Sequence, residues 1–348
     1  MRIKNRVSSL AAITAATALA LAACSGGSDN GNEGGDADAG AGDGGDVSVT
    51  FLPKNLGNPY FDASSEGGEA ALEEIGGTFA EVGPSEATPD AQVSYINTLT
   101  QQQVGAIAVS ANDPTAICDA LVEAKDAGVK VVTFDSDTDS ECRDLFINQA
   151  DADGIARAQI DLIADQIGGS GEIAILSAAA NATNQNAWIE KMEEYAADEY
   201  PDLEIVEIAY GDDEDQMSFD KTAALLQSHS DLKGIVSPTT VGMAAAARYL
   251  STSEYKGEVY LTGLGTPNQL REYIEDGTVE AFALWNPEEL GYLTAYASAA
   301  LINGEITGEE GDTFSAGDLG EYTVEEDSVV VLGDPYVFDA DNIDEFDF

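Results

Sequence analysis

Histidine and cysteine are almost missing from this sequence of 348 residues. It contains one histidine, His229, and three cysteines, Cys24, Cys118 and Cys142. A nucleophilic centre of the Ser/His/Asp or Cys/His type needs a histidine beside its nucleophile. The shortage therefore argues against these enzymes. No spacing typical of metal ligands stands out either, so we expect no metal and no other cofactor.

Basic residues are also scarce. The chain has 14 Lys and Arg against 65 Asp and Glu, which gives a formal net charge of −51. A surface this acidic repels the phosphates of nucleic acids, so we expect no DNA or RNA partner. The excess indicates a solvated surface, as on a salt-adapted or cell-surface protein.

The sequence lacks an apolar run that would give a confident membrane span. Its most apolar stretch, residues 10–23, is rich in alanine and follows a basic start, as in a secretory signal peptide. Residues 21–24 read Leu-Ala-Ala-Cys, which resembles the lipobox of bacterial lipoproteins. The resemblance implies that residues 1–23 are a lipoprotein signal peptide and that Cys24 is the lipid-modified start of the mature protein.

Residues 25–46 contain almost no apolar side chains and are rich in Gly, Ser, Asp, Asn and Glu. Such a segment cannot bury enough apolar surface to order itself. We therefore expect residues 24–46 to combine the lipidated Cys24 with a flexible acidic tether. The protein would then lie outside the cytoplasm and contact the cell membrane only through its lipid anchor.

The other two cysteines, Cys118 and Cys142, form an even pair. In an exported protein such a pair favours a disulfide. Both are predicted to lie on neighbouring connections of the sheet, where a bond is within reach. The sequence leaves two readings open, a disulfide and two separate thiols.

Apolar strands alternate with helices of about 10 to 15 residues from residue 47 onward. This alternation predicts βαβ units and parallel sheets that are covered by helices on both faces. The length of the chain favours two such units, so we expect an α/β fold with two doubly wound parallel sheets. The predicted strands are 47–51, 79–84, 105–112 and 129–137 in the first sheet, and 171–178, 203–211, 232–238 and 257–265 in the second.

Polar residues gather where the predicted strands end. Ligands of open parallel sheets bind outside the carboxyl ends of the strands. Carboxylates and carboxamides can pair with sugar hydroxyls there, and an aromatic face can cover the apolar side of a sugar ring. One such position could be an ordinary turn or cap residue, but six strand ends together indicate a site for a small polyhydroxylated molecule. These ends carry Lys54, Asn55, Asn58, Phe61, Ser110, Asn112, Asp113, Asp135, Ser136, Asp137, Asn184, Gln185, Pro238, Thr239, Thr240, Gly265 and Thr266.

Several motifs between residues 47 and 348 resemble one protein family. They are LPKNLGNPYFDA (52–63), FDSD (134–137), INQ (147–149), TNQNAW (183–188), GTP…LWN (265–286) and the closing NIDEFDF (342–348). The pattern is similar to that of the bacterial periplasmic-type sugar-binding proteins of ABC importers, in the group of rhamnose-binding and autoinducer-2-binding receptors. The resemblance implies a type I periplasmic binding protein fold, in which three hinge crossings join two doubly wound lobes.

The same resemblance implies crossings near residues 147–150, 263–267 and 285–287. The N-terminal lobe would comprise residues 47–146 plus 267–285, and the C-terminal lobe residues 150–262 plus 288–348. A small neutral sugar would bind between the lobes. The partner would be the permease of an ABC importer, and the protein would act as a monomer.

The binding pattern of the family maps onto this chain residue by residue, with one departure. Autoinducer-2 receptors are expected to carry Asp where Asn184 stands, and smaller or acidic residues in place of Thr239 and Thr240. Losing a charged acceptor removes about 1.5–3 kcal/mol per hydrogen bond, which favours a neutral deoxyhexose such as rhamnose. The resemblance implies Lys54, Asp135, Asn184, Gln185, Pro238 and Thr240 as ligand-binding residues, with Phe61 and Trp285 as apolar walls and Asn58, Asp137 and Gln149 as further candidates.

Other functions fit the sequence less well. Asp135 and Asp137 could form an acid/base pair, but residues two apart at a strand end need not face each other, so we expect no enzyme. The segment DADNIDEFD (339–347) lacks the central glycine of an EF-hand calcium loop. A transcription regulator would need a basic helix-turn-helix where the acidic tether stands. A sensor that presents bound sugar to a membrane receptor would use the same site and stays open.

Overall fold

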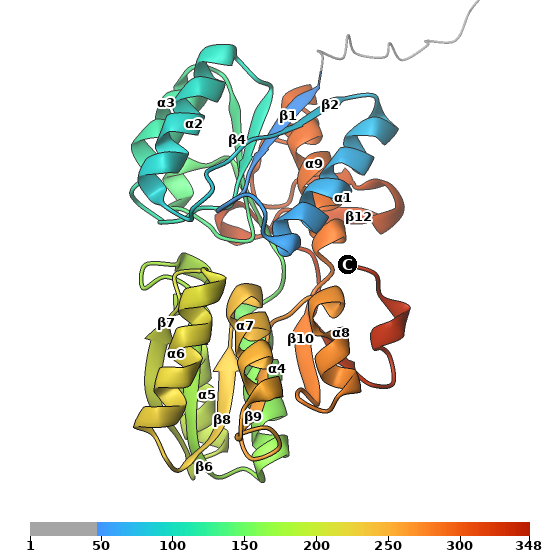
Figure 1. Cartoon of the computed structure of the whole chain (residues 1–348). Helices are drawn as coiled ribbons and strands as arrows, with labels where there is room; N and C mark the ends of the chain where they lie inside the picture. Colours follow the sequence, from blue (N-terminus) through green and yellow to red (C-terminus); the bar gives the residue numbers. More distant parts are fainter. Residues whose placement is uncertain (1–46) are drawn as a thin grey trace, which may run out of the picture. The chain divides into compact units, whose positions relative to one another are not determined.

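The computed structural model of the chain describes residues 47–348, and two parallel sheets organise this part (Figure 1). Helices pack against both sheets. The predicted fold class, α/β with two doubly wound parallel sheets, is therefore confirmed. The predicted signal peptide (1–23), tether (24–46) and lipidated Cys24 lie outside the described residues and stay predictions.

The first sheet has six strands in the order β13-β5-β4-β3-β1-β2, and all of its pairings are parallel. Its central strands are short apolar runs that are buried on both sides, because α1 and α9 pack on one face and α2 and α3 on the other. We call this sheet with its four helices the first lobe. Its elements are β1 (Ser48–Leu52), α1 (Pro59–Ile75), β2 (Thr78–Glu81), α2 (Pro89–Gln102), β3 (Ala106–Val109), α3 (Cys118–Asp126), β4 (Lys130–Phe134), β5 (Leu145–Asn148), α9 (Pro287–Asn303) and β13 (Val329–Val331).

The second sheet has four parallel strands in the order β7-β6-β8-β9. A bridge between Leu264 and Ala283 attaches β10 beside β9, and β10 pairs antiparallel with β14. We call this group the second lobe. Its elements are α4 (Ala152–Ile167), β6 (Gly171–Ser177), α5 (Thr183–Glu199), β7 (Leu203–Tyr210), α6 (Asp215–Ser228), β8 (Leu232–Ser237), α7 (Thr240–Thr252), β9 (Tyr260–Gly263), α8 (Pro267–Glu275), β10 (Ala281–Leu284), β14 (Tyr336–Asp339) and the 3-10 helix η4 (Ile343–Glu345).

The last quarter of the chain does not follow the predicted lobe limits. The helix α9, predicted in the C-terminal lobe, packs against α1, β1, β3 and β4 of the first lobe, and β13 joins the first sheet beside β5. The helix α8 and the strand β10, predicted in the N-terminal lobe, pack on α7, β9 and α4 of the second lobe (Figure 1). The assignments of residues 267–285 and of most of 288–348 are therefore wrong.

The connections between the lobes follow from this packing. The chain passes between lobes after β5, after β10 and after β13. The first two passages agree with the predicted crossings near 147–150 and 285–287. The predicted crossing at 263–267 lies inside the second lobe, because the backbone N–H of Gly265 donates to Ala283 O there. The third passage instead runs through residues 332–335, which sequence reasoning missed.

Close helix contact explains why α9 belongs to the first lobe. A Cβ atom on Gly67 of α1 would lie 1.9 Å from the carbonyl oxygen of Glu288, and one on Gly291 of α9 would lie 1.7 Å from that of Ser64. Only glycine lets two helix backbones approach this closely. The hairpin of β11 (Thr313–Ser315) and β12 (Glu321–Thr323), with the 3-10 helix η2 (Gly317–Leu319), follows α9 and contacts it.

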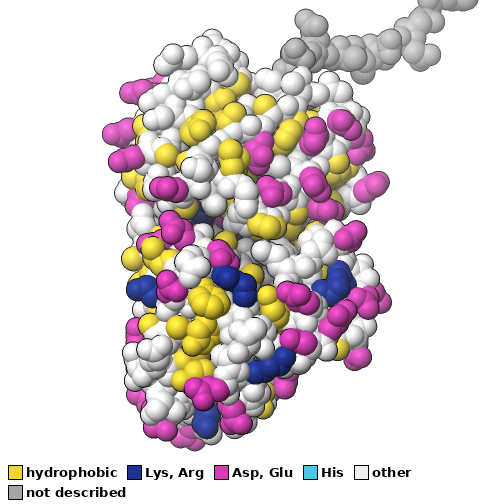
Figure 2. All heavy atoms as spheres, in the orientation of Figure 1, with side chains coloured by type: hydrophobic (Ala, Val, Ile, Leu, Met, Phe, Trp, Pro, Cys, Tyr) yellow, Lys and Arg dark blue, Asp and Glu magenta, His cyan; other side chains and the backbone are white. Residues whose placement is uncertain are grey.

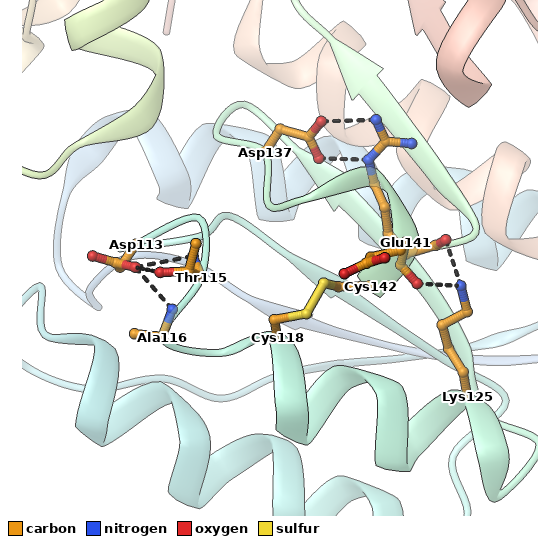
Figure 3. The surroundings of a disulfide bond; sticks show 9 residues. Asp113, Thr115, Ala116, Cys118, Lys125, Asp137, Glu141 and Cys142 are labelled. Carbon is orange, nitrogen blue, oxygen red and sulfur yellow. Dashed lines mark hydrogen bonds and ion pairs between the residues drawn. A yellow bond between two sulfur atoms is a disulfide. The ribbon is translucent and has the colours of Figure 1, made fainter.

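A disulfide joins Cys118, the first residue of α3, to Cys142, the last residue of the 3-10 helix η1 (Ser140–Cys142) (Figure 3). Nearby, Lys125 Nζ donates hydrogen bonds to the carbonyl oxygens of Glu141 (3.3 Å) and Arg143 (2.6 Å). The disulfide and the lysine together attach the connection that follows β4 to α3.

Acidic side chains spread over the molecular face in Figure 2, where Lys and Arg are few. This distribution fits the solvated acidic surface expected from the net charge of −51. Between residues 47 and 348, no helix has both the length and the apolar character needed to cross a membrane.

Candidate functional site

A cavity lies between the two lobes, where the carboxyl ends of β1 and β4 meet those of β7 and β8. Including its opening to solvent, the space between the lining side chains is about 350 Å³. We call it the main cavity. Parallel strands bring their carboxyl ends to one edge of each sheet, so residues far apart in the sequence converge there. The cavity is lined by Lys54, Asn58, Tyr60, Phe61, Asp135, Gln185, Trp188, Asp213, Pro238, Thr239, Thr240, Leu264, Leu284 and Trp285.

The connection between β1 and α1 supplies the first side of the cavity. The side chain of Asn58 accepts a 3.1 Å hydrogen bond from the N–H of Tyr60 and so caps α1, while Pro59 fills the first helical position. This cap fixes the course of the chain before the helix. As a result Lys54, Tyr60 and Phe61 are all placed at the carboxyl edge of the first sheet.

Lys54 joins the lobes across the cavity. Its ammonium group donates to Asn184 Oδ1 at 2.9 Å and to Gln185 Oε1 at 3.4 Å, both on α5 of the second lobe. The same nitrogen lies 4.0 Å from Asp135 Oδ2, and only 4% of Lys54 is exposed. A buried ammonium needs such partners, because it has lost most of its hydration.

Asp135 is the buried carboxylate of the cavity, with 5% of its surface exposed. Its Oδ2 accepts a 2.8 Å hydrogen bond from Ser110 Oγ and a 3.4 Å hydrogen bond from Asn184 Nδ2. Burial raises the pKa of Asp135 above its usual value, although Lys54 and the hydrogen bond from Ser110 act in the opposite direction. Asp135 also has a φ of +61°, a conformation that costs a non-glycine residue of order 1–3 kcal/mol. The fold thus holds this carboxylate in place at a cost in conformational free energy.

Aromatic rings form an apolar wall beside these polar groups. The ring centroids of Tyr60 and Trp285 lie 6.0 Å apart, and those of Trp188 and Trp285 lie 5.8 Å apart, both in edge-to-face arrangements. Trp285 Nε1 donates a 2.8 Å hydrogen bond to the hydroxyl of Tyr60. Burial, followed by the charge of Asp135, raises the pKa of Tyr60 well above its usual value, so its hydroxyl stays protonated. Such rings suit the apolar face of a sugar.

The structure brings most of the predicted site residues together in the main cavity. Eight of them line it, and Asn184 contacts Lys54 and Asp135 at its edge. Asp137 and Gln149 do not line it. The eight are Lys54, Asn58, Phe61, Asp135, Gln185, Pro238, Thr240 and Trp285.

Asp137 and Gln149 line a second cavity, of about 480 Å³ including its opening to solvent, which shares Asp135 and Trp188 with the main one. Asp137 binds the guanidinium of Arg143 in a bidentate manner, at 2.6 and 2.8 Å (Figure 3). Since Arg143 is 4% exposed, this pair has a structural role in the connection after β4. Gln149 is 1% exposed, and neither of its amide atoms has a hydrogen-bond partner within residues 47–348.

Six residues of the main cavity were not among the predicted ligand-binding residues: Tyr60, Trp188, Asp213, Thr239, Leu264 and Leu284. Of these, only Thr239 had been named at a strand end. Trp188 lies three residues after Gln185 on α5, and helical spacing alone predicts that the two share a face. Asp213 follows β7, and it could have been found by applying the strand-end argument to the strand at 203–211. Tyr60 adjoins Phe61, and Thr239 adjoins Pro238 and Thr240.

The groups that line the main cavity can bind a small polar ligand. The residues lining the main cavity include no histidine and no cysteine, so none of them forms a nucleophile–base pair of the usual kind. In the described part of the chain, no three His, Cys, Asp or Glu side chains cluster as metal ligands do. Carboxylates, amides, an ammonium group and aromatic faces are arranged around a small space between two lobes.

Comparison with known proteins agrees with the fold and the motifs. A family model for the periplasmic binding protein domain matches residues 49–306. A sugar ABC transporter structure from Actinomyces odontolyticus is 55% identical, with a TM-score of 0.72 over 89% of this chain and 100% of that one. An ABC transporter solute-binding protein from Clostridium phytofermentas with bound L-rhamnose is 41% identical, with a TM-score of 0.83 over 86% and 97%.

LsrB from Clostridium saccharobutylicum, in complex with AI-2, is 26% identical, with a TM-score of 0.81 over 87% of this chain and 100% of that one. The resemblance stated from the motifs is therefore confirmed, as is the type I fold. The family match and the alignments to the first two structures each cover most of the described residues. The chain thus belongs to the periplasmic binding protein family, among the solute-binding proteins of ABC transporters.

Proposed function

We propose that this protein is the extracytoplasmic binding component of an ABC sugar importer and that it captures L-rhamnose or a similar small neutral monosaccharide in the main cavity. The observation that carries the proposal is the arrangement of Asp135, Lys54 and two amides against an aromatic wall between the two lobes. Sugar hydroxyls need paired donors and acceptors, and the ring needs an apolar face.

The hydrogen bonds across the cavity indicate how a sugar is held. Lys54 bonds to Asn184 and Gln185 of the opposite lobe, and Asn184 bonds to Asp135. A sugar that enters the cavity replaces these bonds with bonds from its own hydroxyls to the same groups. The two lobes then close on it by a hinge motion about the three connections.

Rhamnose is favoured over autoinducer-2 by Asn184. Autoinducer-2 receptors are expected to carry an aspartate at this position of the second lobe. Here the position holds an amide, Asn184, whose Oδ1 accepts a 2.9 Å hydrogen bond from Lys54. The relative with bound L-rhamnose also has the higher identity, 41% against 26% for the relative in complex with AI-2. An autoinducer-2 receptor, or a sugar sensor that presents its ligand to a membrane receptor, remains the second candidate.

The proposed setting follows from the N-terminal sequence. The lipid on Cys24 would anchor the protein to the cell membrane, and the acidic tether of residues 25–46 would let the lobes reach an importer permease. The protein would act as a monomer, would contact the membrane only through its lipid, and would need no cofactor or metal.

A thermal-shift screen of the full chain tests the proposed function. The ligands are L-rhamnose, other pentoses and hexoses, and autoinducer-2. A ligand at 100 times its dissociation constant stabilises the folded state by about 2.7 kcal/mol, so we expect L-rhamnose to raise the melting temperature by several degrees. A larger shift with autoinducer-2 would select the second candidate, and no shift with any of these compounds would refute the proposal.

A further inference from the structure

Asp213 lines the main cavity from the second lobe, on the connection between β7 and α6. Its Oδ1 accepts a 2.5 Å hydrogen bond from Thr239 Oγ1. Thr239 is the N-cap residue of α7, so the carboxylate lies near the positive end of that helix. No Lys, Arg or His of residues 47–348 forms a salt bridge with Asp213. Thr239 thus holds the carboxylate of Asp213 in place without an ion pair in the described part of the chain.

The backbone around Asp213 is strained in the same way as that of Asp135. Asp212 and Asp213 have φ angles of +53° and +52°, and two such non-glycine residues in succession cost of order 1–3 kcal/mol each. The hydrogen bonds from Gly211 N to Ser177 O and from Asp212 N to Ala178 O hold this turn against the end of β6. Both lobes therefore place a carboxylate in the cavity from a residue whose backbone is strained.

The charges of the cavity do not balance. Two carboxylates, Asp135 and Asp213, line it together with one ammonium group, that of Lys54. The two carboxylates influence each other, since the charge of Asp213 is among the causes that raise the pKa of Asp135, after burial. Such a cavity repels an anionic ligand and favours one that donates hydrogen bonds to both sides.

We propose that Asp213 is the second-lobe acceptor for a ligand hydroxyl and, with Asp135, restricts the site to sugars that carry no negative charge. The inference rests on the proposed function and adds to it a binding residue and a physical reason for the preference for neutral sugars. A sugar bound in the cavity donates two hydroxyls to Asp135 and a third to the oxygen of Asp213 that Thr239 leaves free. Thr239 acts as a positioning residue, because it orients the carboxylate of Asp213.

The test compares two neighbouring substitutions, Asp213→Asn and Asp212→Asn, by calorimetric titration of the full chain with L-rhamnose, or with whichever neutral sugar gives the largest thermal shift. Asp212 has the same charge and a nearly identical φ, but it is exposed and does not line the cavity. Asn tolerates this backbone conformation, so both variants should fold. A hydrogen bond to a charged acceptor contributes about 1.5–3 kcal/mol, so Asp213→Asn should weaken binding about 10- to 100-fold. Asp212→Asn should change it less than twofold.

Single deoxy derivatives of the same sugar distinguish contact from a structural effect. One of them should bind the unmodified protein weakly and yet lose no further affinity in the Asp213→Asn variant, because the hydroxyl and its acceptor act as a pair. If the unmodified protein binds the sugar and Asp213→Asn binds it equally well, the inference is wrong while the proposed function stands. Equal losses of affinity in the two variants would also refute the inference, since they would come from a change in the turn that contains Asp212 and Asp213. If the unmodified protein binds no sugar, the proposed function fails and the inference with it.

Discussion

Replacing Asp135 by asparagine is expected to lower sugar affinity at least about 100-fold. Asp135 is buried, held by Ser110 and Asn184, and lies in a left-handed backbone conformation that asparagine also accepts. In the proposed complex its carboxylate accepts two sugar hydroxyls, each worth about 1.5–3 kcal/mol. Calorimetric titration measures the loss. The unliganded variant should still fold, with a melting temperature lowered only by the loss of the charge beside Lys54, so that binding and folding are measured separately.

The pH dependence of binding gives a second readout of the same group. Burial raises the pKa of Asp135 above the ordinary value of 3.8. Hydroxyl donors require the ionised carboxylate, so affinity should be full above this raised pKa and should fall as the pH is lowered through it. The fall should therefore begin at a higher pH than an ordinary aspartate would give. The Asp135→Asn variant should lose this early onset of the fall.

Asp137→Asn is the matched control, because Asp137 lies two residues away but binds Arg143 instead of lining the main cavity. It should leave affinity within a few-fold and lower the melting temperature, since the buried guanidinium loses its charged partner. Unfolding of the Asp135 variant, or an equal loss of affinity in the Asp137 variant, would assign Asp135 to structure.

Local patterns predicted the elements, and they placed at the strand ends several residues that the structure brings into the main cavity. Alternating strands and helices specify parallel sheets, and parallel sheets have their ligand-binding edge at the carboxyl ends of the strands. Lys54, Asp135 and Gln185 could be selected because each follows a strand or begins the next helix. The topology places each of them at the carboxyl edge of its own sheet, and the family resemblance implied that the two edges meet in one cavity.

The lobe limits could not be predicted in the same way. The apolar face of α9 shows that the helix is buried, but it does not show which sheet covers it. The decisive contacts are between backbones, at Gly67 and Gly291, which are separated by more than 200 residues. An isolated glycine in a helical pattern is ambiguous in the sequence, because it can mark a close approach or only lower helix propensity.

Asp137 shows why the role of a side chain could not always be predicted from the sequence. Its position in the FDSD motif is equivalent in kind to that of Asp135, and both are acidic residues at the end of β4. What separates them is Arg143, which reaches Asp137 from the connection that follows. The partner of a carboxylate depends on the tertiary structure, so its position at the end of a strand is not enough to predict that partner.

Removal of the disulfide is expected to have the largest effect on stability. Cys118 and Cys142 are 24 residues apart, and closing a loop of this size in the unfolded chain corresponds to about 3–4 kcal/mol in the chain-entropy account. The double variant Cys118→Ala/Cys142→Ala should therefore melt at least about 5 °C below the unmodified protein in calorimetric scans. The enclosed loop contains β4 and Asp135, so sugar affinity should fall as well, by a smaller factor than in Asp135→Asn.

A reducing agent provides the control for this experiment. It should lower the melting temperature of the unmodified protein to that of the double variant and leave the double variant unchanged, because the variant has no bond to reduce. If both proteins melt at the same temperature without reductant, the disulfide does not stabilise the fold. The packing of α3 on β4, together with the bonds from Lys125 to Glu141 and Arg143, would then be sufficient to hold the Asp135 connection.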